Sequence, residues 1–509
     1  MQKFTTIHQL LTAAAPAGTA ISAPDSPPLG YGQLTALVER SVAQLNALGI
    51  GRGDRVALLM PNGAMTATAF LAVACGATAA PLNPSYRADE IEFYLNDLKA
   101  RALVVEQGSV SPAAEVAQRL GIRVLTLVPD AAAGAGAFTI TGGEAGSAAT
   151  ASPGLAESGD VALILHTSGT TSRPKIVPLT HTNVCASACN VRDQLQLGPK
   201  DTGLTIMPLF HIHGLIAGLL APLAGGGQVF CSPGFNALKF FAWLQEAKAT
   251  WYTAVPTMHQ TILARAPHNQ DIIRANPLRF LRSSSSSMPP QVIKGLEEVF
   301  GAPLIEAYGM TEAAHQMASN PLPPKQRKPG TVGLGAGPEV AVRDNAGTIL
   351  TRSGAGEIVI RGVNVTAGYE NNPTANADAY VDGWFRTGDL GTLDGDGYLS
   401  ITGRIKEIIN RGGEKISPRE IDELLMDHAA VAQVVCFGIP HAKLGEEVGA
   451  VVVLKDGQQA TEKDLRTFCA LHVADYKVPA KILFMDEIPK GATGKLQRIG
   501  LAAKLGLGA

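Results

Sequence analysis

The sequence is poor in charge, and neither sign is in excess. Only 17% of its 509 residues are charged, and the formal net charge is −2. This balance gives no support for nucleic acid or an anionic membrane surface as the main partner. Neither nucleic acid nor a membrane surface is therefore expected as a partner of this chain.

Long apolar runs are also missing. Residues 56–86 and 202–238 contain no charged side chain, but prolines and glycines interrupt both segments. Neither reaches the roughly 18 consecutive apolar residues that a transmembrane helix needs. Both are expected to be buried core.

Cysteine is scarce and scattered. Of the six cysteines only Cys185 and Cys189 lie close together, and no second pair or histidine follows at the spacing of zinc ligands. Such a pattern fits reduced thiols in a cytoplasm. The start of the chain shows no apolar signal core, and its last residues (LGLGA) are not a peroxisomal signal. The expected location is cytoplasmic.

Short strand patterns alternate with helical patterns in the first third of the chain. Residues 55–60 and 103–105 are typical of strands, residues 64–80 form an Ala-rich helical pattern, and residues 130–159 are typical of a surface loop. This alternation predicts an α/β fold in which helices flank parallel sheets. A chain of this length is expected to form at least two domains.

The pattern changes twice towards the C-terminus. From about residue 340 short strands and turns predominate, which predicts a small β-barrel-like subdomain. Residues 407–509 then have the mixed pattern of a small α+β domain. The predicted fold is α/β: a large N-terminal domain of α/β subdomains with a small β-barrel-like subdomain, followed by a mobile α+β domain.

Residues 167–175 (TSGTTSRPK) directly follow the apolar strand pattern of residues 161–166. A strand that ends in such a loop brings backbone N–H groups, hydroxyls and two cations to one point, which suits the oxygens of a polyphosphate. The segment is not a Walker A loop, because no second glycine precedes the lysine. A flexible linker is the alternative, but the preceding strand and the closing Arg-Pro-Lys favour phosphate binding.

Residues 207–214 (MPLFHIHG) contain two histidines. No nearby Cys, Asp or Glu completes a zinc site, so we expect a packed turn with one functional imidazole. Residues 283–287 are five serines between a predicted strand at 279–281 and a predicted helix at 291–300. Small side chains there would let a ligand approach the backbone, although a plain linker is the alternative.

Residues 307–312 (AYGMTE) follow another predicted strand, at 303–306. The tyrosine offers an aromatic face to a purine, and the glutamate offers the lone carboxylate that a magnesium ion bound to phosphate uses. A packed tyrosine and a surface glutamate are the alternatives. The placement at a strand end favours a site.

Four motifs follow in the last third of the chain. They are residues 383–389 (GWFRTGD), 403–407 (GRIKE), 410–417 (NRGGEKIS, with Ser417 as cap of a helix at 418–428) and 489–498 (PKGATGKLQR). Each is weak alone, since aspartates in turns, hairpins and exposed lysines are often purely structural.

In this order and over essentially the whole chain, these segments resemble the motifs of the adenylate-forming enzymes. This superfamily includes acyl-CoA synthetases, luciferases and peptide-synthetase adenylation domains. The resemblance implies ATP, Mg²⁺ and coenzyme A as ligands, with no covalent enzyme intermediate. The implied residues for ATP or AMP are Thr167, Ser168, Gly169, Thr170, Thr171, Lys175, Glu306, Ala307, Tyr308, Gly309, Thr311, Asp389, Arg404 and Lys495.

The resemblance also implies individual roles. The implied catalytic residues are Lys495, Lys175, Thr311 and Glu312, of which Glu312 would hold the metal. The implied division is an adenylation domain at 1–402, a hinge at 403–406 that pivots at Lys406, and a small domain at 407–509. Arg411, Gly412 and Gly413 would line the path of coenzyme A.

Three alternatives share part of this pattern. A peptide-synthetase adenylation domain would be followed by a carrier domain, which we do not expect here. A luciferase-type oxygenase differs only in emitting light. A non-catalytic nucleotide sensor would bind ATP without releasing diphosphate, and the presence of both Lys175 and Lys495 argues against it.

The segments around the predicted acyl end are closer to the oxalate–CoA ligases than to fatty acyl synthetases. On that resemblance His211, Ser285 and His315 bind the acid, and the last two hold its distal carboxylate. A buried second carboxylate needs such donors. A helix-packing histidine is the alternative role for His315, and malonate, a medium-chain fatty acid or an aromatic acid is the alternative substrate.

Overall fold

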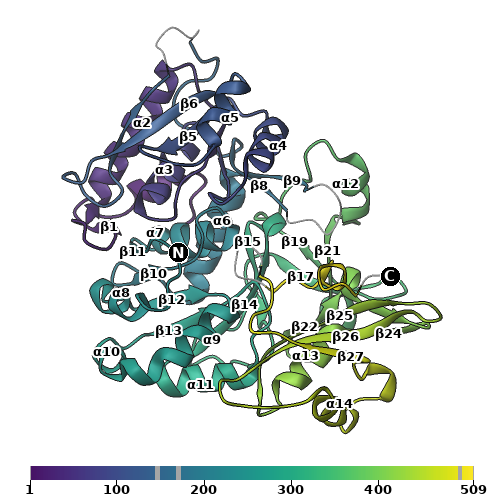
Figure 1. The fold of residues 1–509 in the computed structure, drawn as a ribbon. Helices are drawn as coiled ribbons and strands as arrows, with labels where there is room; N and C mark the ends of the chain where they lie inside the picture. The colour runs from purple at the N-terminus through teal and green to yellow at the C-terminus, as the bar shows by residue number, and fades with distance from the viewer. Residues whose placement is uncertain (1, 144–148, 168–173, 491–495, 508–509) are drawn as a thin grey trace.

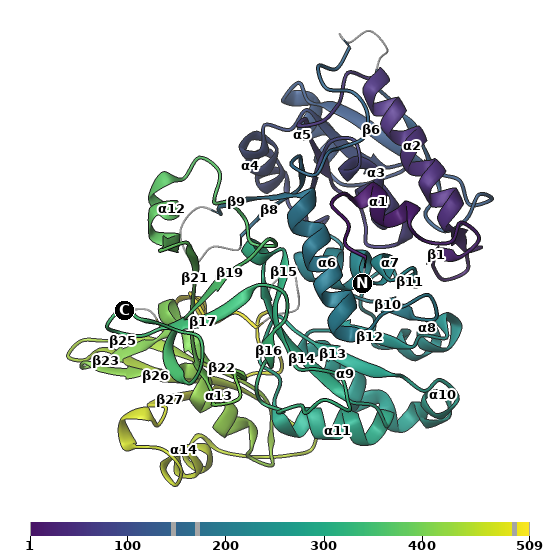
Figure 2. The ribbon, with the colours of Figure 1, turned by 180° about the vertical axis from the view of Figure 1, so that it is seen from behind.

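The computed structural model describes residues 2–143, 149–167, 174–490 and 496–507. They form four sheets: in Figure 1 the first lies at the top, the second below it, the third beside the second, and the fourth at the lower right. Figure 2 shows the same arrangement from behind.

The first sheet has seven strands in the order β7-β6-β5-β3-β4-β8-β9. Its strands are β3 (Arg55–Leu58), β4 (Thr78–Pro81), β5 (Ala102–Glu106), β6 (Arg123–Pro129), β7 (Phe138–Thr141), β8 (Val161–His166) and β9 (Ile176–Thr180). The five central strands are parallel, and β7 and β9 run antiparallel at the edges. Its helices are α2 (Tyr31–Ala47), α3 (Ala64–Ala74), α4 (Ala88–Leu98) and α5 (Ala113–Arg119), and α1 (Ile7–Thr12) precedes them.

Helices cover both faces of this sheet because successive side chains of a strand point to opposite faces. In β3, Val56 and Leu58 pack into the core shared with α2 and α3. Ala57 packs into the separate core that contains Ile91 of α4 and Val116 of α5.

The second sheet has nine strands in the order β16-β15-β14-β13-β12-β10-β11-β1-β2. Its strands are β1 (Thr19–Ser22), β2 (Leu29–Gly30), β10 (Thr202–Thr205), β11 (Gln228–Cys231), β12 (Trp251–Ala254), β13 (Phe280–Ser283), β14 (Leu304–Met310), β15 (His315–Ser319) and β16 (Leu334–Gly335). The six from β14 to β1 in this order are parallel.

The helices around the second sheet also form two layers. They are α6 (His181–Leu195), the π-helix Gly214–Leu220, α7 (Ala221–Ala224), α8 (Phe240–Ala247), α9 (Pro256–Arg265), α10 (Gln270–Ala275) and α11 (Pro290–Phe300). Val191 and Leu195 of α6 pack on Trp251, Phe280 and Ile305. The opposite face packs against α8, α9 and α11. Helix α6 lies between the first and second sheets in both views (Figures 1 and 2).

The third sheet is antiparallel throughout. It contains β17 (Glu339–Arg343), β18 (Ile349–Leu350), β19 (Gly354–Arg361), β20 (Tyr380–Val381), β21 (Trp384–Leu393) and β22 (Leu399–Arg404), with helix α12 (Pro373–Ala379) beside it. The turn Ile405–Glu407 then leads into the fourth sheet.

The fourth sheet belongs to a small C-terminal domain with its own core. It is built from β23 (Ile409–Arg411), β24 (Glu414–Ile416), β25 (Val431–His441), β26 (Gly445–Leu454) and β27 (Lys481–Phe484), together with α13 (Pro418–Met426), α14 (Glu462–Ala470) and α15 (Leu501–Lys504). The predicted α/β fold class with a separate small domain is confirmed.

Three local predictions were wrong. The helix predicted for residues 64–80 ends at Ala74, and Thr78–Pro81 is strand β4. Because buried alanines occur in both elements, the sequence does not show where the helical pattern changes to a strand pattern. The predicted loop at 130–159 contains β7, which pairs with β6. Ser417 precedes α13, but its hydroxyl donates to the Thr402 carbonyl (2.7 Å) rather than capping the helix.

No helix in the described ranges combines the length and apolar character needed to cross a bilayer.

Candidate active site

A cavity of about 570 Å³ lies where the second, third and fourth sheets meet. The predicted site residues among its lining are Thr167, Lys175, His211, Ser285, Glu306, Ala307, Tyr308, Gly309, Thr311, Glu312, His315, Asp389, Arg404 and Lys406. Residues distant in sequence by more than two hundred positions therefore share one cavity.

The remaining predicted residues are placed differently. Ser168, Gly169, Thr170, Thr171 and Lys495 lie outside the described residues. Arg411, Gly412 and Gly413 form the turn between β23 and β24 and are not among the lining residues of the cavity. The Arg411 guanidinium instead pairs with Glu447 at 2.6 Å.

Parallel strands of the second sheet position most of these cavity-lining side chains at one edge of that sheet. Ser283 of β13 is in register with Ala254 of β12 and with Glu306 of β14. Because parallel strands share a direction, the segments after their carboxyl ends emerge together. The serine run and the segment 307–312 meet at the cavity for this reason.

A tight turn then reverses the chain. Thr311–Ala313 joins β14 to the antiparallel β15, and Met310 faces His315 across the pair. Glycine is required at position 309, since a Cβ there would lie 1.8 Å from the His315 carbonyl oxygen. The turn therefore presents Glu312 and His315 to the same cavity.

Tyr308, Asp389 and Arg404 are connected at one end of the cavity. Asp389 is buried and accepts hydrogen bonds from the Tyr308 hydroxyl and from Nε of Arg404, the latter at 2.7 Å. Pairing of β21 with β22 sets Asp389 directly opposite Arg404. Burial lowers the pKa of the Arg404 guanidinium, but the charge of Asp389 outweighs this effect and raises that pKa above its ordinary value.

Lys175, Tyr369 and Glu312 meet at a second point. Nζ of Lys175 lies 4.2 Å from the centre of the Tyr369 ring, and the Tyr369 hydroxyl donates to Oε1 of Glu312 at 2.8 Å. Burial raises the pKa of Glu312, and the bond from Tyr369 partly counters this. Thr167 and Lys175 exchange hydrogen bonds at the base of the β8–β9 connection.

A further group of polar side chains surrounds Ser285 and His315, in the part of the cavity that we call the acyl end. His213 is fully buried, and its Nδ1 lies 3.1 Å from the Ser285 hydroxyl. The His213 and His315 rings are stacked with centroids 4.9 Å apart. Behind them Arg282 is fully buried, and its Nη2 donates to Nε2 of His315 at 3.0 Å.

Two family models match this chain. The model described as AMP-binding enzyme matches residues 12–370, and the AMP-binding enzyme C-terminal domain matches residues 420–495. The chain belongs to the AMP-binding enzyme family. The predicted membership of the adenylate-forming superfamily is confirmed.

Curated relatives and solved structures match along the whole AMP-binding fold. An oxalate–CoA ligase of Arabidopsis thaliana is 45% identical over 92% of this chain and 92% of its own length. An oxalate–CoA ligase of Saccharomyces cerevisiae is 42% identical over 88% and 86%. The ATP-bound crystal structure of MatB from Rhodopseudomonas palustris superimposes with a TM-score of 0.87 at 29% identity, covering 99% of both chains.

The cavity of this AMP-binding enzyme fits Mg·ATP chemistry. Glu312 is a buried carboxylate, and burial raises its pKa against the lowering effects of Tyr369, Arg404 and Lys175. In the described ranges no three His, Cys, Asp or Glu side chains gather as a protein-built metal site. A single carboxylate is the arrangement used where phosphate oxygens supply the other magnesium ligands.

Sequence reasoning missed four residues of this cavity and its surroundings: Tyr369, Arg282, Asp422 and Arg498. Arg498 reaches into the cavity from the small domain and pairs with Asp422 (2.7 Å) and Glu407 (3.1 Å). Nothing near Tyr369 in the sequence signals a site. Arg282 lies between the predicted strand at 279–281 and the serine run, and the sequence alone indicated no role for it.

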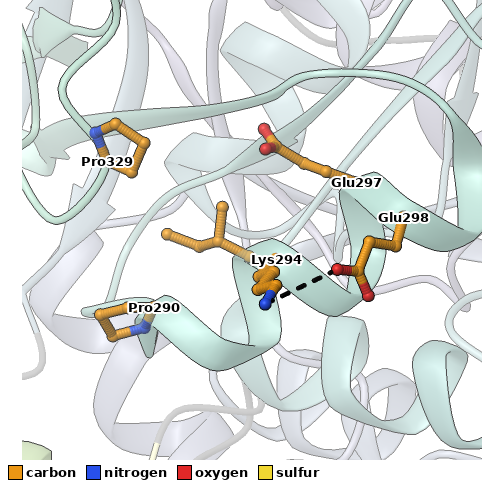
Figure 3. Close-up of a pocket in the computed structure, with 6 residues that line it drawn as sticks. Pro290, Lys294, Glu297, Glu298 and Pro329 are labelled. Carbon is orange, nitrogen blue, oxygen red and sulfur yellow. Dashed lines mark ion pairs between the residues drawn. The ribbon is translucent and has the colours of Figure 1, made fainter.

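A shallower surface hollow lies along α11 (Figure 3). Its acidic residues are already paired, because Glu298 faces Lys294 at 3.9 Å and Glu297 bonds to Arg327 at 2.6 Å. The hollow contains none of the predicted site residues.

Proposed function

We propose that this chain is an AMP-forming acid–thiol ligase that converts oxalate, ATP and coenzyme A to oxalyl-CoA, AMP and diphosphate. The observation that carries the substrate is the polar acyl end, where Ser285 and His315 line the cavity and Arg282 lies behind them. The names of the Arabidopsis and yeast relatives support the same assignment.

The nucleotide is assigned to the end of the cavity that contains Tyr308 and Asp389. Tyr308 offers a ring to the adenine, and its hydrogen bond to Asp389 fixes the carboxylate that would accept from the ribose hydroxyls. A carboxylate has lone pairs for more than the two donors it already binds. Arg404, held by the same carboxylate, is then close to the ribose.

The chemistry of the first step needs alignment and neutralisation of charge. A carboxylate oxygen of the acid attacks the α-phosphorus, the bond from that phosphorus to the bridging oxygen breaks, and diphosphate leaves with the electron pair. We assign Lys175 and Thr167, which line the cavity, to the phosphate oxygens, and Thr311 to the α-phosphate. A magnesium ion held by Glu312 would supply further positive charge to the phosphates.

The second step is attack of the coenzyme A thiol on the acyl carbon, from which AMP leaves. We assign Lys495 to the first step, and Arg411, Gly412 and Gly413 to the coenzyme A path of the second. Arg411 to Gly413 are not among the residues that line the present cavity, which supports a rotation of residues 407–509 about Lys406 between the steps. All six cysteines are buried free thiols, and we propose a cytoplasmic location.

The oxalate assignment is preferred over a fatty or aromatic acid on physical grounds. An alkyl chain gains free energy from apolar walls, whereas the acyl end presents a polar imidazole and a polar hydroxyl, which an alkyl chain would desolvate. The second carboxylate of a short diacid accepts hydrogen bonds from both. Malonate carries the same group on a longer chain and is the closest competitor.

The test is diphosphate release against a panel of oxalate, malonate, acetate, hexanoate and benzoate, with and without coenzyme A. We expect oxalate to exceed malonate and acetate by a wide margin, and His315→Ala to lose oxalate turnover far more than ATP affinity. Lys294→Ala, on exposed α11, is the matched control. Faster turnover of hexanoate or benzoate would refute the substrate while leaving the ligase in place.

A further inference from the structure

The charge of Arg282 is buried without a carboxylate partner. Its side chain is fully buried, and its hydrogen-bond partners are the side chains of His213, Thr253, His315 and Gln316, none of which is a carboxylate. Its Nε has no partner, and no carboxylate in the described part of the chain pairs with it. Burial lowers the pKa of Arg282 to about 9, so the guanidinium is still a cation at neutral pH.

An unpaired buried cation is costly, because the energy of removing a charge from water is not returned by an opposite charge. Proteins rarely retain such a group without a counter-ion. Arg282 is not among the residues that line the cavity, but His315, which accepts its hydrogen bond, is. The missing negative charge can therefore come from a ligand at the acyl end.

Arginine only donates hydrogen bonds, and this fixes the direction of the contacts around it. Nε2 of His315 accepts from Nη2 at 3.0 Å, so the ring proton of His315 is on Nδ1. Nε2 of His213 lies 3.3 Å from Nη1 and 2.7 Å from the Thr253 hydroxyl, and Nδ1 of His213 lies 3.1 Å from the Ser285 hydroxyl. Arg282 therefore contacts Ser285 through His213 and contacts the acyl end through His315.

The titratable groups around Arg282 are histidines. His213 and His315 both lie within hydrogen-bond distance of the guanidinium, and protonation of either ring would set two cations in contact. His259 lies on the other side, where its Nε2 bonds to the Arg282 carbonyl oxygen, and burial lowers the pKa of His259 to about 4. The positive charge therefore resides on Arg282.

The backbone also supports a ligand-binding role. Ser285 has φ +77° and His315 has φ +95°, conformations that are uncommon for residues with a Cβ. Such strain tends to persist at functional sites, where the surrounding structure imposes it. Here the two strained residues are the two that present polar groups to the acyl end.

We propose that Arg282 is a specificity-determining positioning residue that selects acids with a negatively charged distal group. It supplies the positive charge from behind the cavity wall and orients His315, whose Nε2 accepts from the guanidinium, without touching the acid. This inference rests on the proposed oxalate ligase function and deepens it. The enzyme would select the distal group of the acid by its negative charge as well as by its hydrogen-bonding geometry.

The test compares oxalate with oxamate, in which an amide replaces one carboxylate at nearly the same size. The wild-type enzyme is expected to favour oxalate in kcat/KM by roughly 30- to 5,000-fold, the range for loss of one partner of a buried charge pair. Arg282→Gln should remove most of that ratio through a higher KM for oxalate. The oxamate kinetics and the KM for ATP should change little, and Arg282→Lys should retain more of the ratio than Arg282→Gln.

Arg192→Gln is the matched control. Arg192 is also buried, but it pairs with Asp193 on α6 and does not line the cavity. It is expected to lower thermal stability without changing the oxalate-to-oxamate ratio. Equal losses on oxalate and oxamate in Arg282→Gln would overturn the proposal and leave Arg282 a structural residue.

A measurement on the wild-type enzyme keeps the proposal testable if Arg282→Gln does not fold. Calorimetric binding of oxalate, with magnesium and a non-hydrolysable ATP analogue, is repeated at pH 7.5 in buffers of different ionisation enthalpy. We expect no proton uptake, since the cation is already present. Uptake of about one proton would show that a histidine becomes charged when oxalate binds, and it would overturn the proposal. Absence of oxalate activation in the wild-type enzyme would instead refute the proposed function.

Discussion

The Tyr369 hydroxyl donates a 2.8 Å hydrogen bond to Oε1 of Glu312, deep in the cavity. The ring of the same tyrosine lies 4.2 Å from Nζ of Lys175. Tyr369 therefore connects the carboxylate proposed to hold magnesium with the cation proposed to bind the phosphates. Tyr369 thus contacts both of the charged groups, Glu312 and Lys175, that are proposed to bind Mg·ATP.

Replacing Tyr369 by phenylalanine separates these two contacts. The ring over Lys175 is kept, but Glu312 loses its donor. We expect the magnesium concentration for half-maximal diphosphate release to rise by roughly 10-fold, because a hydrogen bond to a charged group contributes about 1.5 kcal/mol. Tyr398→Phe, whose ring lies near Lys328 outside the cavity, is the control. An unchanged magnesium requirement would show that the bond does not orient Glu312.

Lys175→Ala removes the cation itself. Loss of a fixed positive charge opposite the polyphosphate should lower kcat/KM for ATP by at least about 100-fold in the first step. Conversion of supplied oxalyl-adenylate and coenzyme A to the thioester should be nearly unaffected, since no polyphosphate is present in that step. Lys248→Ala, on a residue outside the cavity lining, is the control. Wild-type adenylation by Lys175→Ala would disprove the phosphate role.

Glu306 gives the unliganded protein a pH-dependent stability. Burial raises its pKa to about 8, against an ordinary value of 4.5, so the folded state holds a proton that the unfolded chain releases. The stability of the protonated form is fully present below about pH 4.5 and is lost as the pH rises through 8.

Glu306→Gln should therefore have the higher Tm at pH 8.5 and nearly the wild-type Tm at low pH, as measured by thermal unfolding without ligands. Glu298→Gln is the control, because the Glu298 side chain is 66% exposed. A parallel pH dependence in wild-type protein and Glu306→Gln would contradict the assigned pKa.

The fold could be predicted where apolar runs have clear ends. Strand β8 runs over Val161–His166 as the sequence indicated, because its apolar residues are bounded by a polar turn and the loop at 167–175. The helix predicted to residue 80 fails because alanine suits both helix and buried strand. Only the pairing of Thr78–Pro81 with Arg55–Leu58, a long-range contact, decides between them.

Some residues of the candidate site could likewise be predicted from the sequence, and others could not. Residues within continuous motifs, such as Tyr308 and Glu312, were found because each motif carries its chemistry in adjacent positions. Tyr369 and Arg282 were missed because their partners come from other strands and loops: Arg282 meets His315 only after β13 and β15 flank β14 in one sheet. Charge compensation across strands leaves no local pattern in one sequence.

The last prediction concerns the two lysines proposed for domain movement. If residues 407–509 rotate between the steps, Lys495 serves adenylation alone, and the hinge serves the passage to the second step. Lys495→Ala should fail to release diphosphate from ATP and oxalate, yet convert supplied oxalyl-adenylate and coenzyme A to thioester.

Lys406→Pro should do the opposite, because proline fixes φ within the turn Ile405–Glu407 and restricts rotation there. Lys406→Ala separates loss of the side chain, which lines the cavity, from loss of backbone freedom. We expect Lys406→Ala to retain both half-reactions and Lys406→Pro to retain adenylation alone, with each step followed in a separate single-turnover assay. Equal damage to both steps in Lys495→Ala and in Lys406→Pro would mean that one fixed arrangement of the domains performs the whole reaction.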